Sequence, residues 1–432
     1  MNPNRLERSV REILALILTL AALSPGSSAF GQAKNQTADL EALMKSAPRV
    51  FLDCSYCDVD YIKTEITFVN YVRDRKEAQI HVLVTTQPTG GGGTEFTLTF
   101  SGQLEFAGDD HVFKYVSNKT DTEDEIRKGF ARVLKIGLLA YAGKTPIAER
   151  ISISLSGAGK ASSEAVKDRW NYWVFSLSGS GYFSGEESQR YYSLYGSLSA
   201  NRVTPRWKIR TTLSANRNKD SFSYEGDTIE SSSSSRNFNA LVVKSITNHW
   251  SIGSWFSANS STYSNMKFSI SPAPAIEYDL FPYEESTRRQ LRFLYKAGFY
   301  AFRYREETIF DKTSERLWGE TFSATLELKE KWGEISSSLE GFHYFNDIRK
   351  NHIRAYSELS IRLVKGLRLS FYGSFSRVHD QLSLVKGEAS LEEILLRRRQ
   401  LATSYNYYGS VGLSYTFGSI YSNVVNPRFG GY

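Results

Sequence analysis

The chain ends in a segment whose apolar and polar residues alternate strictly. In TSYNYYGSVGLSYTFGS, residues 403–419, Tyr405, Tyr407, Val411 and Leu413 are separated by mostly small, polar residues. A period of two predicts a β-strand with one apolar and one polar face. A soluble barrel would turn the apolar face inward, whereas a membrane barrel would turn it toward lipid.

The same period continues through most of the chain, from Trp170 to Phe417. It predicts an all-β domain of about 12 antiparallel strands in up-and-down order. The expected strands are 171–183, 190–202, 207–219, 237–246, 250–262, 267–278, 290–306, 317–330, 334–346, 352–364, 367–379 and 404–417.

The length of these strands favours a membrane barrel over a secreted, soluble all-β binding protein. Many run to about 12 residues, whereas strands of soluble proteins usually have about 5–6 and a tilted membrane strand needs about 9–11. The connections are expected to be short at one rim, where Trp207, Trp250 and Trp332 lie, and longer at the other. The longer ones are 218–236, 309–316, 346–351 and 380–402.

The N-terminus has the features of a secretory signal. Arg5, Arg8 and Arg11 precede the apolar run 13–23, and small residues follow it. We therefore predict a signal peptide over 1–33. No later stretch has the roughly 20 consecutive apolar residues of a membrane helix. Export combined with membrane strands predicts location in the outer membrane of a Gram-negative bacterium.

The region before the long strands has a mixed pattern of apolar and polar residues, without continuous alternation. Its pattern predicts strands and one helix, 122–143, whose first turn has a capping box in Thr122 and Glu125. We expect an α+β organisation: a periplasmic α/β domain at 49–156, a linker at 157–169, a barrel at 170–418 and a periplasmic tail at 419–432. The strands expected in the α/β domain are 49–54, 79–86, 94–102 and 111–116.

One face of the long strands carries the charged residues, and we predict that this face lines the lumen. In 353–363, for example, Arg354, Glu358 and Arg362 alternate with apolar residues. The mixed signs predict ion pairs across the bore and not a ring of one sign that would select ions. The predicted lumen-lining residues are Arg292, Lys296, Glu327, Lys329, Glu340, Arg354, Glu358, Arg362 and Arg368.

The last strand also carries a motif. Ser410, Gly412, Tyr415 and Phe417 follow the order polar–x–Gly–x–x–aromatic–x–hydrophobic. This resembles the C-terminal β-signal of Gram-negative outer-membrane β-barrel proteins, and the resemblance implies the barrel assembly machinery and outer-membrane lipids as partners. The chain departs from the usual form because it continues beyond Phe417. The N-terminal region also resembles small periplasmic α/β modules that precede some barrels, without a motif of one family.

Cys54 and Cys57 are the only two cysteines. We favour a local disulfide, because an exported protein meets an oxidising compartment. A thioredoxin-like redox pair, a metal site and two free thiols are the alternatives, and the nearby Asp53, Asp58 and Asp60 would be hard ligands beside soft ones. The prediction is no metal and no cofactor.

The composition excludes other classes of partner. The formal net charge is +7, but the basic residues do not cluster, so we expect no nucleic acid. The glycine run in 89–95 lacks the Gly-Lys-Ser/Thr ending of a phosphate-binding loop and predicts a hairpin loop.

The predicted function is passive transport of small polar solutes, or scaffolding in which residues 49–156 bind a periplasmic protein. The alternative is an outer-membrane hydrolase, a lipase or protease, with an active site at the rim. His352 and His379 lie beside Asp380 and Asp347 in the expected outer loops, and a His–Asp pair can activate water. We favour exposed polar residues over a catalytic site there, and we assign no catalytic residue.

Overall fold

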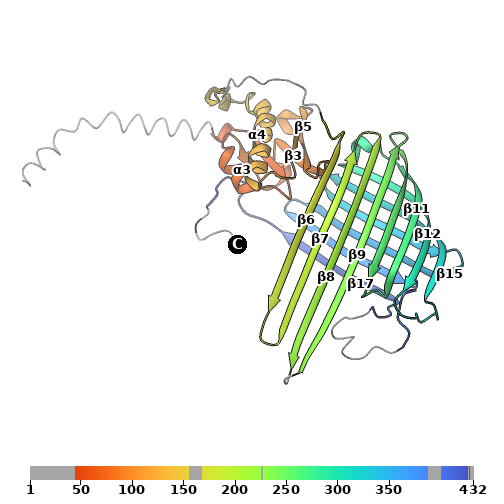
Figure 1. Ribbon diagram of the computed structural model, residues 1–432. Coiled ribbons are helices and arrows are strands. Elements are labelled where there is room, and N and C mark those ends of the chain that lie inside the picture. Colours follow the sequence, from red (N-terminus) through yellow and green to blue (C-terminus); the bar gives the residue numbers. More distant parts are fainter. Residues whose placement is uncertain (1–43, 155–167, 225–226, 388–399, 427, 429–432) are drawn as a thin grey trace, which may run out of the picture.

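The computed structural model describes residues 44–154, 168–224, 227–387, 400–426 and 428. The predicted signal peptide and linker residues 157–167 lie outside this range. The described chain has two parts: an α/β domain at one end of a large antiparallel sheet (Figure 1). Among the described residues, no helix is both long and apolar enough to cross a bilayer.

The domain contains a five-stranded sheet in the order β2-β1-β3-β4-β5. β1 pairs in parallel with β2 and β3, and β3, β4 and β5 form an antiparallel meander. The elements are β1 (Arg49–Asp53), α3 (Val59–Glu65), β2 (Asn70–Tyr71), β3 (Ile80–Pro88), β4 (Thr94–Gly102), β5 (Asp110–Val116) and α4 (Glu123–Ala142), with short 3₁₀ turns η1 (Arg75–Glu77), η2 (Leu104–Phe106) and η3 (Pro146–Arg150).

Helix α4 covers this sheet and contributes one face to the domain core. Thr122 and Glu125 form the predicted capping box at its N-terminus. Its apolar face is buried with side chains of the strands, and Gly137 permits close packing: a Cβ there would lie 2.2 Å from the Phe100 ring. The buried helix residues include Phe130, Leu134, Leu138 and Tyr141.

The large sheet has 12 strands, each hydrogen-bonded to the next along the chain, with β6 and β17 at the two ends of the order. This confirms the predicted α/β domain followed by an antiparallel up-and-down array. The strands are β6 (Trp173–Gly185), β7 (Gln189–Val203), β8 (Trp207–Tyr224), β9 (Asp227–Ser245), β10 (Trp250–Ser261), β11 (Met266–Asp279), β12 (Arg289–Tyr304), β13 (Ser314–Glu330), β14 (Gly333–Tyr344), β15 (Asp347–Val364), β16 (Leu367–Val378) and β17 (Tyr405–Tyr415); η4 (Tyr283–Glu285) lies before β12.

The contrast between the two rims is weaker than predicted. We call the rim nearest the domain the domain-side rim and the opposite one the distal rim. The prediction of a loop at 218–236 was wrong, because β8 and β9 extend into this range and pair there. Lys219 and Glu230 form a 2.9 Å ion pair between them. Its serine-rich sequence suggests a loop by composition, but strand pairing needs only backbone groups. Likewise, β15 already begins at Asp347.

Candidate functional site between the domain and the large sheet

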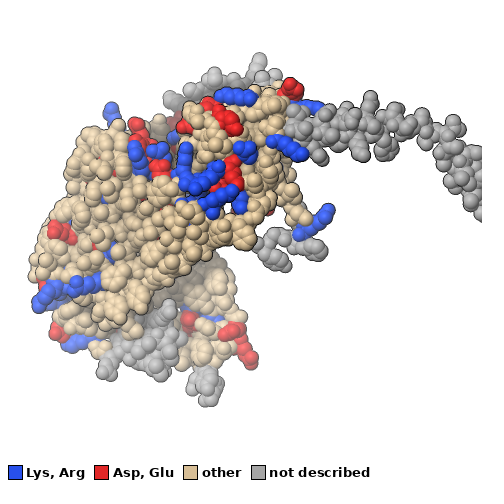
Figure 2. All heavy atoms as spheres, turned by 180° about the vertical axis from the view of Figure 1, so that it is seen from behind, with Lys and Arg blue, Asp and Glu red and all other residues tan. Residues whose placement is uncertain are grey.

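The strand register sorts the side chains of the large sheet onto two faces. All nine residues predicted to line the lumen share one face, which we call the charged face. The other, apolar face exposes large side chains to solvent, and the strand wall seen in Figure 2 is almost free of charge between its ends. Examples of exposed apolar residues are Leu177, Leu198, Leu213, Phe238, Phe322, Leu339, Phe375 and Tyr407.

Ion pairs on the charged face join neighbouring strands. Arg354 on β15 lies 3.4 Å from Glu340 on β14, and Arg292 on β12 lies 3.7 Å from Glu277 on β11. We expected pairs across the bore, and the described residues show pairs along the wall instead. Neighbouring strands are about 4.8 Å apart, so long side chains reach each other there first.

Near the distal rim the charged face becomes aromatic. Tyr300, Leu317, Phe342 and Tyr344 pack there with Leu382, which comes from the connection between β16 and β17. This cluster reduces the free space over that part of the charged face.

Of the residues named for the hydrolase alternative, the structure brings His352 and Asp380 together, but Asp347 does not join them. His352 is nearly buried, and its Nδ1 lies 2.6 Å from Asp380 while its Nε2 lies 3.3 Å from Glu340. Asp347 instead pairs with Arg349. Carboxylates thus contact both imidazole nitrogens of His352, and among the described residues no serine, threonine or cysteine hydrogen-bonds to this ring.

At the domain-side rim, one ion pair anchors the domain to the charged face. The Arg362 guanidinium donates to both carboxylate oxygens of Asp53 at 2.5 and 2.7 Å and lies over the Phe51 ring. The buried His81 ring contacts the same carboxylate through Nε2 at 3.0 Å. Burial alone would raise the pKa of Asp53, but the hydrogen bonds with His81 and Arg362 and the Arg362 charge lower it to about 2.

The tight turn between β15 and β16 makes a second anchor. Lys365 forms an ion pair with Glu77, and the Gly366 amide donates to Asp74 at 2.9 Å. Gly366 has φ +75°, and a Cβ there would lie 2.2 Å from the Thr416 carbonyl oxygen. The positive φ and the close approach of the Thr416 backbone therefore require glycine at this position.

The domain also contacts the opposite end of the strand order. Lys119 donates to Ser176 on β6, and a Cβ built on Gly90 would lie 2.7 Å from the Cβ of Val203 at the end of β7. Ser176 lies on the same face of the sheet as the charged residues, opposite the apolar Leu177. The domain thus reaches the charged face from both ends of the sheet order.

The C-terminal tail connects the last strand to the domain. After Gly418 the chain runs antiparallel to β2, with a bridge between Val72 and Tyr421. The Arg73 amide donates to the Ile420 carbonyl at 3.0 Å, and the Ser422 amide donates to the Tyr71 carbonyl at 2.9 Å. The described part of the tail therefore adds an edge strand to the domain sheet.

The assembly-signal residues lie around the end of β17. Ser410, Gly412 and Tyr415 belong to the strand, whereas Phe417 lies two residues beyond it and is 76% exposed. Their role in assembly stays a prediction. In the domain, the structure bonds Cys54 to Cys57 between β1 and α3, next to Asp53.

Most of the anchoring residues were missed by the sequence analysis. It selected Arg362 and Arg368 because they alternate with apolar residues. It weighed Asp53 only as a metal ligand beside the cysteines, and it offered no reason to select Asp74 or Glu77. The partners of these three carboxylates lie about 300 residues away in the chain. No local pattern carries that information.

Solved structures similar to this chain include a porin and the translocator domain of an autotransporter. No protein-family model matches the chain, and no curated protein matches it. The NanC porin is 12% identical, with 56% of this chain and 99% of that chain covered and a TM-score of 0.27. The translocator domain of the autotransporter NalP from Neisseria meningitidis is 8% identical, with 57% and 87% covered and a TM-score of 0.26. At this level of similarity, neither structure bears on what this chain binds.

Proposed function

We propose that the chain is an outer-membrane β-barrel protein that conducts small polar solutes and whose N-terminal domain lies in the periplasm. The observation that carries this proposal is the two-faced sheet: exposed large apolar side chains on one face and charged side chains on the other. If the sheet lies in a bilayer, the apolar face must contact lipid, because the other face would expose charged side chains to hydrocarbon. The charged face then lines a hydrated bore.

The position of the domain refines this proposal. It contacts β6, β7, the turn between β15 and β16 and the segment after β17, so it lies across the domain-side mouth. The aromatic cluster covers part of the charged face near the distal rim. Both features favour a restricted pathway for small solutes over a wide pore.

Conductance of the full chain in planar bilayers tests this function. Discrete steps that scale with salt concentration support it. A chain that fractionates with the outer membrane but stays silent would refute the transport role and favour the scaffold role, in which the anchored domain binds a periplasmic protein. Recovery from the soluble periplasm would contradict both.

A further inference from the structure

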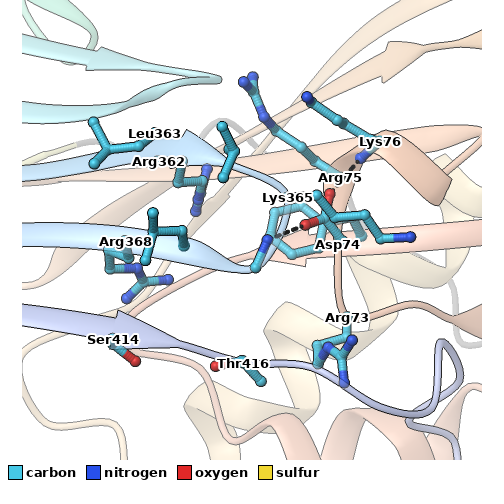
Figure 3. A pocket seen from close by; sticks show the side chains of 14 residues that line it. Arg73, Asp74, Arg75, Lys76, Arg362, Leu363, Lys365, Arg368, Ser414 and Thr416 are labelled. Carbon is cyan, nitrogen blue, oxygen red and sulfur yellow. Dashed lines mark hydrogen bonds between the residues drawn. The ribbon is translucent and has the colours of Figure 1, made fainter.

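A cavity of about 300 Å³ lies where the domain meets the end of the large sheet. Its walls come from the segment after β2, the turn between β15 and β16 and the end of β17, and Figure 3 shows that its side chains come from both the domain and the sheet. Basic residues dominate the lining: Arg73, Arg75, Lys76, Arg362, Lys365 and Arg368.

Positive charge in this cavity is only partly neutralised. Asp74 is the one carboxylate among the lining residues, against six cations. Asp53 and Glu77 pair with Arg362 and Lys365 from behind the wall, which still leaves three more cations than carboxylates. The Asp74 carboxylate itself accepts hydrogen bonds from the backbone amides of Lys76 and Gly366. Within the described residues, no ion pair holds Arg75, Lys76 or Arg368.

The register shows which side the cavity faces. Arg368 pairs with Arg362 on one neighbouring strand and with Ser414 on the other, so these three side chains sit together on the charged face. Ser414 and Thr416 add hydroxyl donors to the lining. Arg362, Arg368 and Ser414 therefore line the cavity from the charged face, on the side of the proposed bore.

We propose that this cavity binds the oxyanion group, phosphate or carboxylate, of a water-soluble solute at the domain-side mouth. The inference rests on the proposed function, because the bore is what brings the solute there. Arginine presents a planar set of donors that fits carboxylate and phosphate oxygens in pairs. Gathered cations repel one another, and a bound oxyanion relieves that repulsion. A phospholipid headgroup offers the same phosphate chemistry, but the charged-face location favours the soluble source.

Calorimetric titration of the folded, full-length protein with inorganic phosphate in detergent at low salt tests the site. The test variant carries Arg75→Gln and Arg368→Gln. The matched control carries Arg349→Gln and Lys350→Gln, which removes two cations from the distal end of β15. We expect saturable binding that weakens as salt rises, at least tenfold weaker binding in the test variant, and unchanged binding in the control. Absence of binding by the wild type, or equal affinity in all three proteins, would overturn the site.

Further measurements distinguish a soluble solute from a phospholipid headgroup, and the transport function from the oxyanion site. If short-chain phosphatidylglycerol binds this site and inorganic phosphate does not, the soluble source is wrong. Heat-modifiable gel migration identifies variants that fail to fold, and Arg75→Gln alone then serves as the test variant. A silent wild type in bilayers defeats the transport function, while the phosphate titration still reports on the cavity. Conductance with no effect of the test variant on phosphate affinity defeats only this inference.

Discussion

At the scale of single residues, Asp53 connects the domain core to the large sheet. Its carboxylate contacts the buried ring of His81 on one side and the guanidinium of Arg362 on the other. Both partners favour the ionised form of Asp53. The contact therefore contributes most to the free energy of unfolding at pH values where Asp53 is ionised in the folded and in the unfolded protein.

This contact makes a prediction for pH. The pKa of Asp53 falls from 3.8 to about 2 on folding, so its contribution is complete above pH 4 and is lost as pH falls toward 2. Asp53→Asn should lower the free energy of unfolding of the domain by about 2 kcal/mol at pH 7, and by much less near pH 2. Chemical unfolding followed by near-ultraviolet circular dichroism at both pH values measures this. A difference that does not depend on pH would contradict it.

A second residue-scale prediction tests the two faces. Leu359, which pairs with Ile335 and Phe371, lies on the apolar face, and its neighbour Glu358 accepts the Tyr356 hydroxyl at 2.8 Å on the charged face. Leu359→Arg should cost about 2–4 kcal/mol near the bilayer midplane. Glu358→Gln should cost about 1 kcal/mol or less. Urea titration of protein folded into liposomes gives the order, and a larger cost for Glu358→Gln would mean that the faces are reversed.

At the scale of elements, the sequence predicted the strands well and their ends less well. Alternation identified all 12 strands because each has one face that differs from the other in polarity. It misplaced the distal ends of β8 and β9. Both faces of these strands are polar there, as in the serine run 231–235, so apolar and polar residues do not alternate. The short β2 was missed as well, since two residues show no period.

The candidate site was beyond such prediction for a different reason. Alternation can place Arg362 on a face, but it cannot say that Asp53 will meet it. That contact depends on how two parts of the chain dock. The same holds for Gly366, whose sequence signal is that of any tight turn.

The tail strand makes a prediction at this scale. A chain ending at Phe417 loses the bonds from the Arg73 amide to Ile420 and from the Ser422 amide to Tyr71. Hydrogen exchange at the Arg73 amide should become much faster, since an edge strand without a partner is open to water. The Val72 amide, which donates to Val50, is the internal control and should stay protected. Equal protection at Arg73 in both chains would show that the tail does not pair with β2.

At the scale of the whole molecule, the domain bridges the two ends of the strand order. It contacts β6 and β7 through residues 90 and 119, and β15 through Arg362. Domains joined only by a linker usually move independently. Anchors at both ends of the sheet order oppose such motion and hold the domain over the mouth.

Cross-linking tests this placement. Gly90→Cys combined with Val203→Cys should form a disulfide under oxidising conditions, because the two Cβ positions are 2.7 Å apart and need to separate by only about 1 Å to reach disulfide geometry. Gly91→Cys with Val203→Cys is the control, since a Cβ at residue 91 meets only Thr89. We expect the cross-linked protein to migrate faster on non-reducing gels and its conductance to rise on reduction. Equal cross-linking of both pairs would contradict a fixed domain.

The tail strand also sets an order in time. Asn70 and Asn423 are 353 residues apart and hydrogen-bonded at 2.9 Å, and closing a loop of that length costs about 5 kcal/mol of chain entropy before any contact compensates for it. Synthesis proceeds from the N-terminus, so the domain leaves the ribosome before the large sheet, yet the segment that covers its β2 edge follows β17. In a chain that stops before Ile420, the β2 edge of the domain has no partner, although the domain is synthesised before the large sheet. The covered edge at β2 can therefore form only after residue 422 has been synthesised and the chain has folded back from Asn423 to Asn70.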